Sequence, residues 1–367
     1  MKSRVSIVKC NSYDFEEVFQ AAEKAFEFIG GISSFIKNGE KVLIKPNILS
    51  GRPPQDGVNT HVDVARACVR LVKGCGAIPI IGDSPGGSVS PKEVYETSGF
   101  SSMAKDEGTE LAEVKDVRMI DGIPFASYFF ECDKIISVPK MKTHSLTTLT
   151  GAVKNMFGAV SGLNKSECHK RFPKPEGFSR LLVDVFEKVR PHLVLMDAVI
   201  AMDGDGPAAG RLRDVGLLLA SQDSVAMDSV FAYLIGIDPY RILTTKEAAM
   251  RGLGQIDLEN IEILGQGLKD SFIKNFKLPS SRIVIKLPDF IVETLAGFVR
   301  FRPYIKEEAC KRCMICQKSC PLSAITISDK RCAMDYNKCI RCMCCHEVCP
   351  YGAVRLRRNI LARAMGL

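Results

Sequence analysis

The residues best suited to chemistry in this sequence are cysteines gathered near its C-terminal end. Ten of the 15 cysteines lie between Cys310 and Cys349. They form two runs that start 29 residues apart and share one spacing: three cysteines separated by two residues, a fourth after three more residues, and then proline. The runs are Cys310, Cys313, Cys316, Cys320 and Pro321, then Cys339, Cys342, Cys345, Cys349 and Pro350. This pattern is typical of bacterial ferredoxins that hold two iron–sulfur clusters.

The spacing also predicts which thiolates hold which cluster. Three cysteines at this spacing wrap a loop around one cubane and leave its fourth iron to be bound from elsewhere. In two-cluster ferredoxins the fourth cysteine of each run binds the other cluster. We therefore predict two [4Fe–4S] clusters, one held by Cys310, Cys313, Cys316 and Cys349, the other by Cys339, Cys342, Cys345 and Cys320.

Zinc is the alternative occupant of this segment, because repeated pairs of cysteines also suit a tetrahedral zinc site. Zinc would use two pairs per ion, whereas each run has a third cysteine, a fourth and a proline, which favours clusters. Cys332 and Cys344 lie outside the pattern. Cys344, next to Cys345, is interpreted as a packed or exposed thiol, and ligand exchange on a damaged cluster is the alternative.

Composition limits the cellular setting. With 46% hydrophobic and 25% charged residues the chain is an ordinary globular protein. No run of 18 uncharged apolar residues occurs, and acidic residues interrupt the start before a signal-peptide core. We expect no membrane span and a cytoplasmic location, where thiols stay reduced and bind metal.

The net charge of +8 resides in the same segment as the cysteines. Residues 310–367 hold eleven Lys or Arg against three Asp or Glu, and residues 1–309 are neutral. A basic tail often indicates nucleic acid. Thiolate-bound clusters, however, bring negative charge that the formal count omits. Since no nucleic-acid motif or set of interleaved aromatic residues is present, we expect no nucleic-acid partner.

The first 265 residues alternate strand-like apolar runs with amphipathic helical stretches, the pattern of an α/β fold with a mostly parallel sheet and crossover helices. The expected strands are Val5–Val8, Val42–Ile44, Ile78–Ile81, Ile135–Val138, Leu193–Met196, Val215–Ala220 and Ile261–Leu264. The expected helices include Asp14–Phe28, His61–Lys73, Phe178–Val189 and Ser224–Leu234. We divide the chain into an α/β body (1–265), a connector packed on it (266–305), with an apolar stretch at Phe290–Phe301, and a small ferredoxin-like α+β domain (306–367).

Polar segments follow five of the expected strands. They begin at Lys45, Asp83, Lys140, Asp197 and Gln222. The carboxyl ends of parallel strands lie along one edge of a sheet, where such folds bind ligands. We therefore expect the five segments to converge on one cleft.

The body resembles the family known as domain of unknown function 362, over about residues 40–240. The likeness rests on Val42–Asn47, Ile80–Gly87, Val138–Val160, Leu195–Pro207 and Ala220–Pro239, which occur in the family's order. Members of that family often carry a ferredoxin-like cysteine tail. The resemblance implies a redox context without supplying a reaction.

Residue types suggest what the cleft could do. Cations and amides predominate, so an anionic ligand is the simplest inference. Lysine stabilises negative charge that develops on a substrate, and histidine can deliver a proton after an electron arrives. We predict Lys140, His144 and Lys154 as catalytic residues. The predicted substrate-binding residues are Lys45, Asn47, Asp83, Lys142, Asn155 and Asp197.

Other interpretations of the cleft stay open. Asp83, Asp197, Asp203 and Asp205 could bind a divalent metal or simply cap turns. A flavin is a further candidate, although no nucleotide-binding glycine motif is present.

The predicted function is an iron–sulfur oxidoreductase that passes low-potential electrons to an anionic small molecule. A ferredoxin or another low-potential donor is the expected partner. The alternative is a non-enzymatic electron-transfer protein whose body docks a redox partner. The sequence leaves the oligomeric state open.

Overall fold

One large sheet organises the body. The structure is a computed structural model that describes residues 2–87, 89–162, 164–281, 301–328 and 331–358. The sheet has ten strands in the order β12-β1-β11-β10-β7-β2-β3-β4, with β8 attached to β10 and β9 to β8. Their bounds are β1 (Ser3–Lys9), β2 (Lys41–Pro46), β3 (Ile78–Ile81), β4 (Glu110–Leu111), β7 (Lys134–Val138), β8 (Lys140–His144), β9 (Thr148–Leu149), β10 (Leu193–Asp203), β11 (Arg211–Ser221) and β12 (Ile261–Gly265).

Most strand pairs of this sheet are parallel. The pairs β10–β7, β7–β2, β2–β3, β3–β4 and β1–β12 are parallel, and β11 alone on this path runs antiparallel to both neighbours, β1 and β10. The predicted mostly parallel sheet is therefore confirmed. All seven strands expected from the sequence lie inside observed strands, because each is an apolar run of the length that a buried strand needs.

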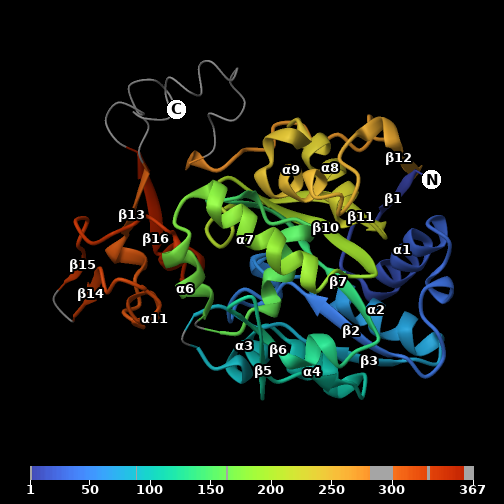
Figure 1. The fold of residues 1–367 in the computed structure, drawn as a ribbon, viewed down its shortest axis with the longest axis horizontal. Coiled ribbons are helices and arrows are strands. Elements are labelled where there is room, and N and C mark those ends of the chain that lie inside the picture. The colour runs from blue at the N-terminus through green and yellow to red at the C-terminus, as the bar shows by residue number, and fades with distance from the viewer. Residues whose placement is uncertain (1, 88, 163, 282–300, 329–330, 359–367) are drawn as a thin grey trace.

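Helices cover both faces of the sheet (Figure 1). Strand residues alternate between the two layers: Val42 and Ile44 pack in the core under α1 and α2, whereas Leu43 packs in a second core with α7. The first layer comprises α1 (Phe15–Phe28), α2 (Val62–Gly74), α3 (Pro91–Thr97) and α4 (Phe100–Asp106). The second comprises α5 (Ala152–Asn155), α7 (Pro175–Lys188), α8 (Ser224–Leu234) and α9 (Leu243–Met250). A hairpin of β5 (Val117–Ile120) and β6 (Ile123–Ala126) flanks the body.

The antiparallel β11 corrects one expectation about the cleft. Gln222 and Asp223 follow β11, so they lie at the sheet edge opposite to the carboxyl ends of β2, β3 and β7. There Asp223 caps α8 by accepting bonds from the N–H groups of Val225 and Ala226. The fifth polar segment is therefore structural, and only the other four remain near the predicted cleft.

A second finding concerns Lys140–His144, the polar segment that follows the expected strand Ile135–Val138. These residues form β8, with Lys140 opposite Asp197 and Lys142 opposite Met202 on the long β10. All five are buried, since β8 continues the sheet instead of leaving it.

The C-terminal domain lies at one end of the body, beside α6 (Asn164–Arg171), as Figure 1 shows in orange and red. Its described residues include two antiparallel strand pairs and two short α-helices. These are β13 (Phe301–Ile305) with β16 (Val354–Arg358), β14 (Ile325–Ile327) with β15 (Cys332–Met334), α11 (Ile315–Lys318) and α12 (Cys344–Glu347).

The predicted boundary of this domain needs a small shift. Phe301–Ile305 were assigned to the connector, but they form β13 of the small domain's sheet. The rest of the apolar stretch Phe290–Phe301 lies outside the described residues. Among the helices that the structure describes, none has the length and apolar character needed to span a membrane.

Candidate functional site

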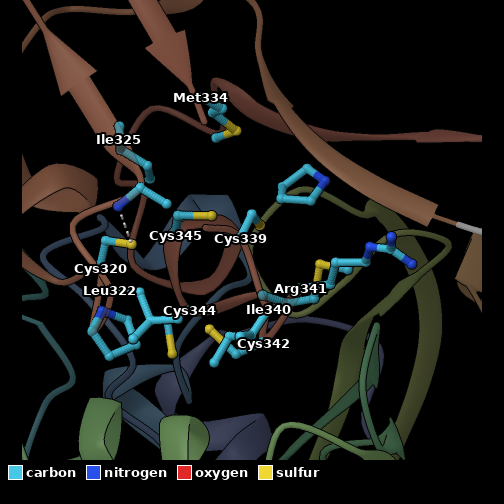
Figure 2. A pocket seen from close by; sticks show the side chains of 14 residues that line it. Cys320, Leu322, Ile325, Met334, Cys339, Ile340, Arg341, Cys342, Cys344 and Cys345 are labelled. Atoms are coloured by element: carbon cyan, nitrogen blue, oxygen red, sulfur yellow. Dashed lines mark hydrogen bonds between the residues drawn. The ribbon is translucent and has the colours of Figure 1, made fainter. Parts of the chain in front are cut away.

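Each predicted set of ligand cysteines surrounds one cavity. Cys310, Cys313, Cys316 and Cys349 line the first, which we call the outer cavity. Cys320, Cys339, Cys342 and Cys345 line the second, the inner cavity, together with Ile325 and Met334 (Figure 2). Cys320 and Cys349 thus each lie with the three close-spaced cysteines of the other run, in the arrangement that the spacing predicts.

The two runs share one backbone conformation. Arg312 and Met314 have positive φ angles of 50° and 62°, and their counterparts Arg341 and Met343 have 59° and 65°. The fourth thiol of each run also accepts a backbone bond: Ala324 N–H donates to Cys320 Sγ and Ala353 N–H to Cys349 Sγ, both at 3.2 Å. Four thiols, an apolar wall and amide donors to sulfur are what a [4Fe–4S] cubane requires, so both cavities fit the cluster.

A third cavity lies between the body and the inner run, and we call it the interface pocket. The body contributes Lys45, Asn47, Asp83, Lys154, Asn155, Lys165 and His169, and the small domain contributes Cys344, Glu347 and Val348. Cys344 also lines the inner cavity. The interface pocket and the inner cavity therefore share a wall.

Direct contacts hold the small domain against the body. Both ring nitrogens of His346 approach carbonyl oxygens, Nδ1 that of Val354 at 2.8 Å and Nε2 that of Asp205 at 3.1 Å. Arg355 donates to the Ala209 carbonyl at 2.8 Å. Gly87 comes so close to Ser319 and Val348, with φ at +91°, that a side chain there would be strained. The carboxyl edge of the sheet is thus covered by the inner run.

Lys45 and Asp83 form a buried ion pair on one side of the pocket. Lys45 Nζ lies 2.9 Å from Asp83 Oδ1 and donates to the carbonyl of Pro46 and the amide oxygen of Asn155. Burial lowers the pKa of Lys45, and Asp83 opposes that shift. Gly158 packs directly against both side chains, where a Cβ would overlap them. The Lys45 ammonium therefore has no N–H bond left for a ligand, and the ion pair forms part of the pocket wall.

Lys154 lines the same pocket but, unlike Lys45, has no ion-pair partner among the described residues. Asp228 of α8 accepts the N–H bonds of Ala152 and Val153, which fixes the start of α5 and points Lys154 at the small domain. Lys154 is 9% exposed, and its ammonium makes no hydrogen bond or ion pair with any described residue. Burial lowers its pKa, with Glu347 and Asp83 acting in the opposite direction. A buried cation without a close counter-ion is a strong anion-binding group.

Glu347 brings a carboxylate from the small domain. His144 Nδ1 accepts the N–H bonds of Leu146 and Thr147, so its proton resides on Nε2, 3.1 Å from Glu347 Oε1. His169 Nε2 lies 3.9 Å from the same oxygen. Burial lowers the pKa of His144 to about 3 and that of His169 to about 4. Burial alone would raise the pKa of Glu347, but His144, His169 and Lys154 lower it, which keeps the carboxylate charged.

The predicted body residues separate into two groups. Lys45, Asn47, Asp83, Lys154 and Asn155 line the interface pocket. Lys140, Lys142, His144 and Asp197 are buried and are not among its lining residues.

Lys140 and Asp197 form a network of their own. Lys140 Nζ lies 2.8 Å from Asp197 Oδ2 and donates to the Tyr13 hydroxyl at 2.6 Å, while that hydroxyl donates to Asp197 Oδ1 at 2.8 Å. Lys142 donates to the Val58 carbonyl at 2.5 Å. These side chains satisfy one another or the backbone and stabilise the fold behind the pocket.

The four aspartates considered for a divalent metal are dispersed. Asp203 pairs with Arg211 at 2.8 Å, and Asp205 accepts from Ser280 N–H at 2.7 Å. In the part of the chain that the structure describes, no three His, Cys, Asp or Glu side chains meet as ligands of a single metal ion.

Lys165, His169 and Glu347 are ionisable pocket residues that sequence reasoning did not predict. Lys165 and His169 are four residues apart on α6, so both fall on one helix face, a spacing that could have identified them. Lys165 donates to the Ser84 carbonyl, and burial lowers its pKa to about 8. No sequence pattern marks Glu347, because it lines the pocket only where the small domain packs against the body.

Fold and site together define an iron–sulfur protein: an α/β body whose sheet edge is covered by a ferredoxin-type domain. Comparison with known proteins agrees, since residues 302–350 match the 4Fe-4S dicluster domain. Residues 42–233, just over half of the chain, match the domain of unknown function DUF362. The chain belongs to this family.

Two further proteins are similar to the chain. The "Thylakoid-associated protein sll1697" of Synechocystis is 30% identical over 311 residues, which cover 82% of this chain and 96% of that protein. The lactate racemase apoprotein from Thermoanaerobacterium thermosaccharolyticum shares 11% identity with a TM-score of 0.38, over 61% of this chain and 55% of the racemase. That second likeness is too distant to bear on the site.

Proposed function

We propose that this protein is an oxidoreductase that carries low-potential electrons through two [4Fe–4S] clusters to an anionic small molecule in the interface pocket. The observation that supports it best is Cys344, which lines both the inner cavity and the pocket. Cys344 neighbours Cys345, a predicted ligand of the inner cluster. A molecule in the pocket would therefore lie next to the electron source.

The clusters would supply single electrons near the roughly −400 mV of plant-type ferredoxins. The chain's own residues provide the rest. Lys154 would stabilise negative charge that grows on the bound molecule, because its ammonium is buried and makes no hydrogen bond or ion pair with any described residue. Lys165 holds a proton at neutral pH and can release it, since its pKa is lowered to about 8. His144, also considered as the proton donor, lies behind Glu347 and has a pKa of about 3.

Electrons would enter at the outer run. Cys313 is exposed, and its neighbours Lys311, Arg312 and Met314 are exposed as well. A ferredoxin or another low-potential donor could approach this surface, and its acidic groups would meet two basic side chains. We place this exchange in the cytoplasm.

One observation favours the non-enzymatic alternative. Lys45 and Lys140, two of the predicted cations, are fully paired inside the body. If Lys154 and Lys165 also serve only the fold, the body would be a docking platform for a redox partner.

The clusters are tested first. Protein reconstituted without oxygen should bind about eight irons, and the reduced form should give the EPR spectrum of two cubanes. Zinc in place of iron would rule out the electron-transfer proposal.

The enzyme and docking proposals are then separated by the small molecules that anaerobically purified protein retains, identified by mass spectrometry. The enzyme proposal predicts that a retained anion oxidises the reduced clusters and that Lys154→Met slows this oxidation at least tenfold while both clusters stay bound. The docking proposal predicts that no retained molecule reoxidises the clusters.

A further inference from the structure

We infer that the interface pocket is built for a small monocarboxylate with a short apolar body, rather than for a phosphate or a dicarboxylate. The inference rests on the pocket of the proposed function and names the class of its ligand. It depends on binding alone and requires no turnover.

The charges that line the pocket set the charge of the ligand. Lys45 and Asp83 cancel each other at 2.9 Å. Glu347 supplies one further negative charge, while Lys154 and Lys165 supply two positive charges. The remaining excess is one positive charge, which one carboxylate balances. A dianion would leave a negative charge uncompensated in a buried site, and the neighbouring cluster, itself negative, would increase that cost.

The free hydrogen-bonding groups agree with this charge. Lys154 has no partner among the described residues, and Lys165 uses one of its three N–H bonds on the Ser84 carbonyl. Two ammonium groups therefore await an acceptor of the size of a carboxylate.

One wall of the pocket is apolar. Ile48, Leu49, Phe157 and Val348 form this apolar wall, beside Ser166 and the glycines Gly86, Gly87 and Gly158. An inorganic anion would leave this apolar wall without contacts, whereas a short hydrocarbon chain would cover it.

Isothermal titration of the holoprotein with oxidised clusters tests the inference, with butyrate, succinate and inorganic phosphate as probes. Butyrate should bind, and succinate and phosphate should bind at least about tenfold more weakly. Lys154→Met and Lys165→Met should each weaken butyrate binding by about tenfold or more, the usual loss for a hydrogen bond to a charged group. Lys154→Arg keeps the charge and should retain binding.

Lys170→Met is the matched control, because Lys170 lies on α6 like Lys165 but is exposed and paired with Glu167 at 3.3 Å. It should bind butyrate like the wild type, and iron content verifies that each variant keeps its clusters. Phosphate or succinate binding as tightly as butyrate, or no saturable butyrate binding, would overturn the inference. If butyrate binds but no ligand reoxidises the clusters, the inference about the ligand class is upheld and only the proposed reaction is refuted.

Discussion

The two cysteine runs are alike in spacing and backbone and opposite in surroundings. Positive φ angles recur at Arg312 and Arg341 and at Met314 and Met343, and a short helix follows each pair. Yet Cys313 and Met314 of the outer run are exposed, Met314 by 41%, whereas Cys342 and Met343 of the inner run are buried. The same ligand pattern thus lies in two different environments, which depend on what packs against each loop.

The body is what makes the difference. The outer loop faces solvent and carries Lys311 and Arg312, while the inner loop faces Lys154, His169 and the rest of the interface pocket. An exposed cluster can exchange electrons with a partner protein, and a buried one can exchange them with a bound molecule. This difference in burial supports the proposed direction of electron flow, from the outer run to the inner run.

Loss of one ligand from each run should break the comparison most strongly. Cys316→Ala and Cys345→Ala are equivalent positions, and each should lose about half of the iron because one cubane loses a thiolate. Cys345→Ala should abolish oxidation of the clusters by a pocket ligand. Cys316→Ala should keep that oxidation when dithionite supplies the electrons, but it should lose reduction by a protein donor. Stopped-flow absorbance measures both rates, and equal behaviour of the two variants would refute the assigned direction.

The second-largest effect should come from acid, which acts on His144 and His169 near the inner run. The pKa values of His144 and His169 are lowered to about 3 and about 4, so the folded protein excludes protons that the unfolded chain binds below about pH 6.5. The contribution of the two neutral histidines to the free energy of unfolding is therefore fully present above pH 6.5. It decreases as the pH falls toward these pKa values, by at most about 1.4 kcal/mol per pH unit for each histidine. The thermal midpoint of the holoprotein should decrease between pH 7 and pH 5.

His144→Gln should reduce that decrease, because glutamine does not titrate. Iron content at both pH values shows whether the clusters remain bound. An identical pH dependence in the variant and the wild type would mean that the interface between body and small domain does not control acid stability.

Sequence reasoning predicted the cluster-binding pattern and the sheet far better than the pocket, for physical reasons. A cysteine run encodes its own geometry in its spacing, and a buried strand is visible as an apolar run such as Val42–Ile44. The direction of a strand is not visible in this way. The sequence therefore predicts Gln222 and Asp223 at the wrong edge of the sheet, because β11 runs antiparallel to β10.

Pocket membership depends on contacts between distant segments. Lys140 and Lys154 have the same side chain, but Tyr13 and Asp197 pair with Lys140 and nothing described pairs with Lys154. Glu347 joins the pocket only because the small domain docks on the body. Such differences come from packing and leave no local mark in the sequence.

A charge change beside each run should sharpen the comparison. Lys154 is buried next to the inner cavity, and Lys311 is an exposed lining residue of the outer cavity. A unit charge about 10 Å away at an effective dielectric constant of about 20 is worth ~1.7 kcal/mol, or about 70 mV for one electron. Lys154→Met should make the inner cluster's reduction potential more negative by roughly this amount. Lys311→Met should shift the outer potential much less, because water and salt screen an exposed charge.

EPR-monitored redox titration resolves both potentials in each variant. A shift of the outer cluster in Lys154→Met, or an equal shift in Lys311→Met, would contradict the difference in burial.

The smallest expected effect concerns the two cysteines outside the ligand sets, since each run has one beside a ligand. Cys332 Sγ lies 3.8 Å from Cys310 Sγ at the outer run, and Cys344 is close enough to Cys342 at the inner run to lower that thiol's pKa. A thiol that donates to a ligand sulfur stabilises the reduced cluster, so replacing it with alanine should make that cluster's potential more negative. Cys332→Ala should change the outer cluster alone and Cys344→Ala the inner cluster alone. The inner shift should be larger, because Cys344 is buried and Cys332 is partly open to water, which can replace its bond. Redox titration of both variants decides this, and a larger shift at Cys332 would show that burial does not govern how strongly the protein tunes its two clusters.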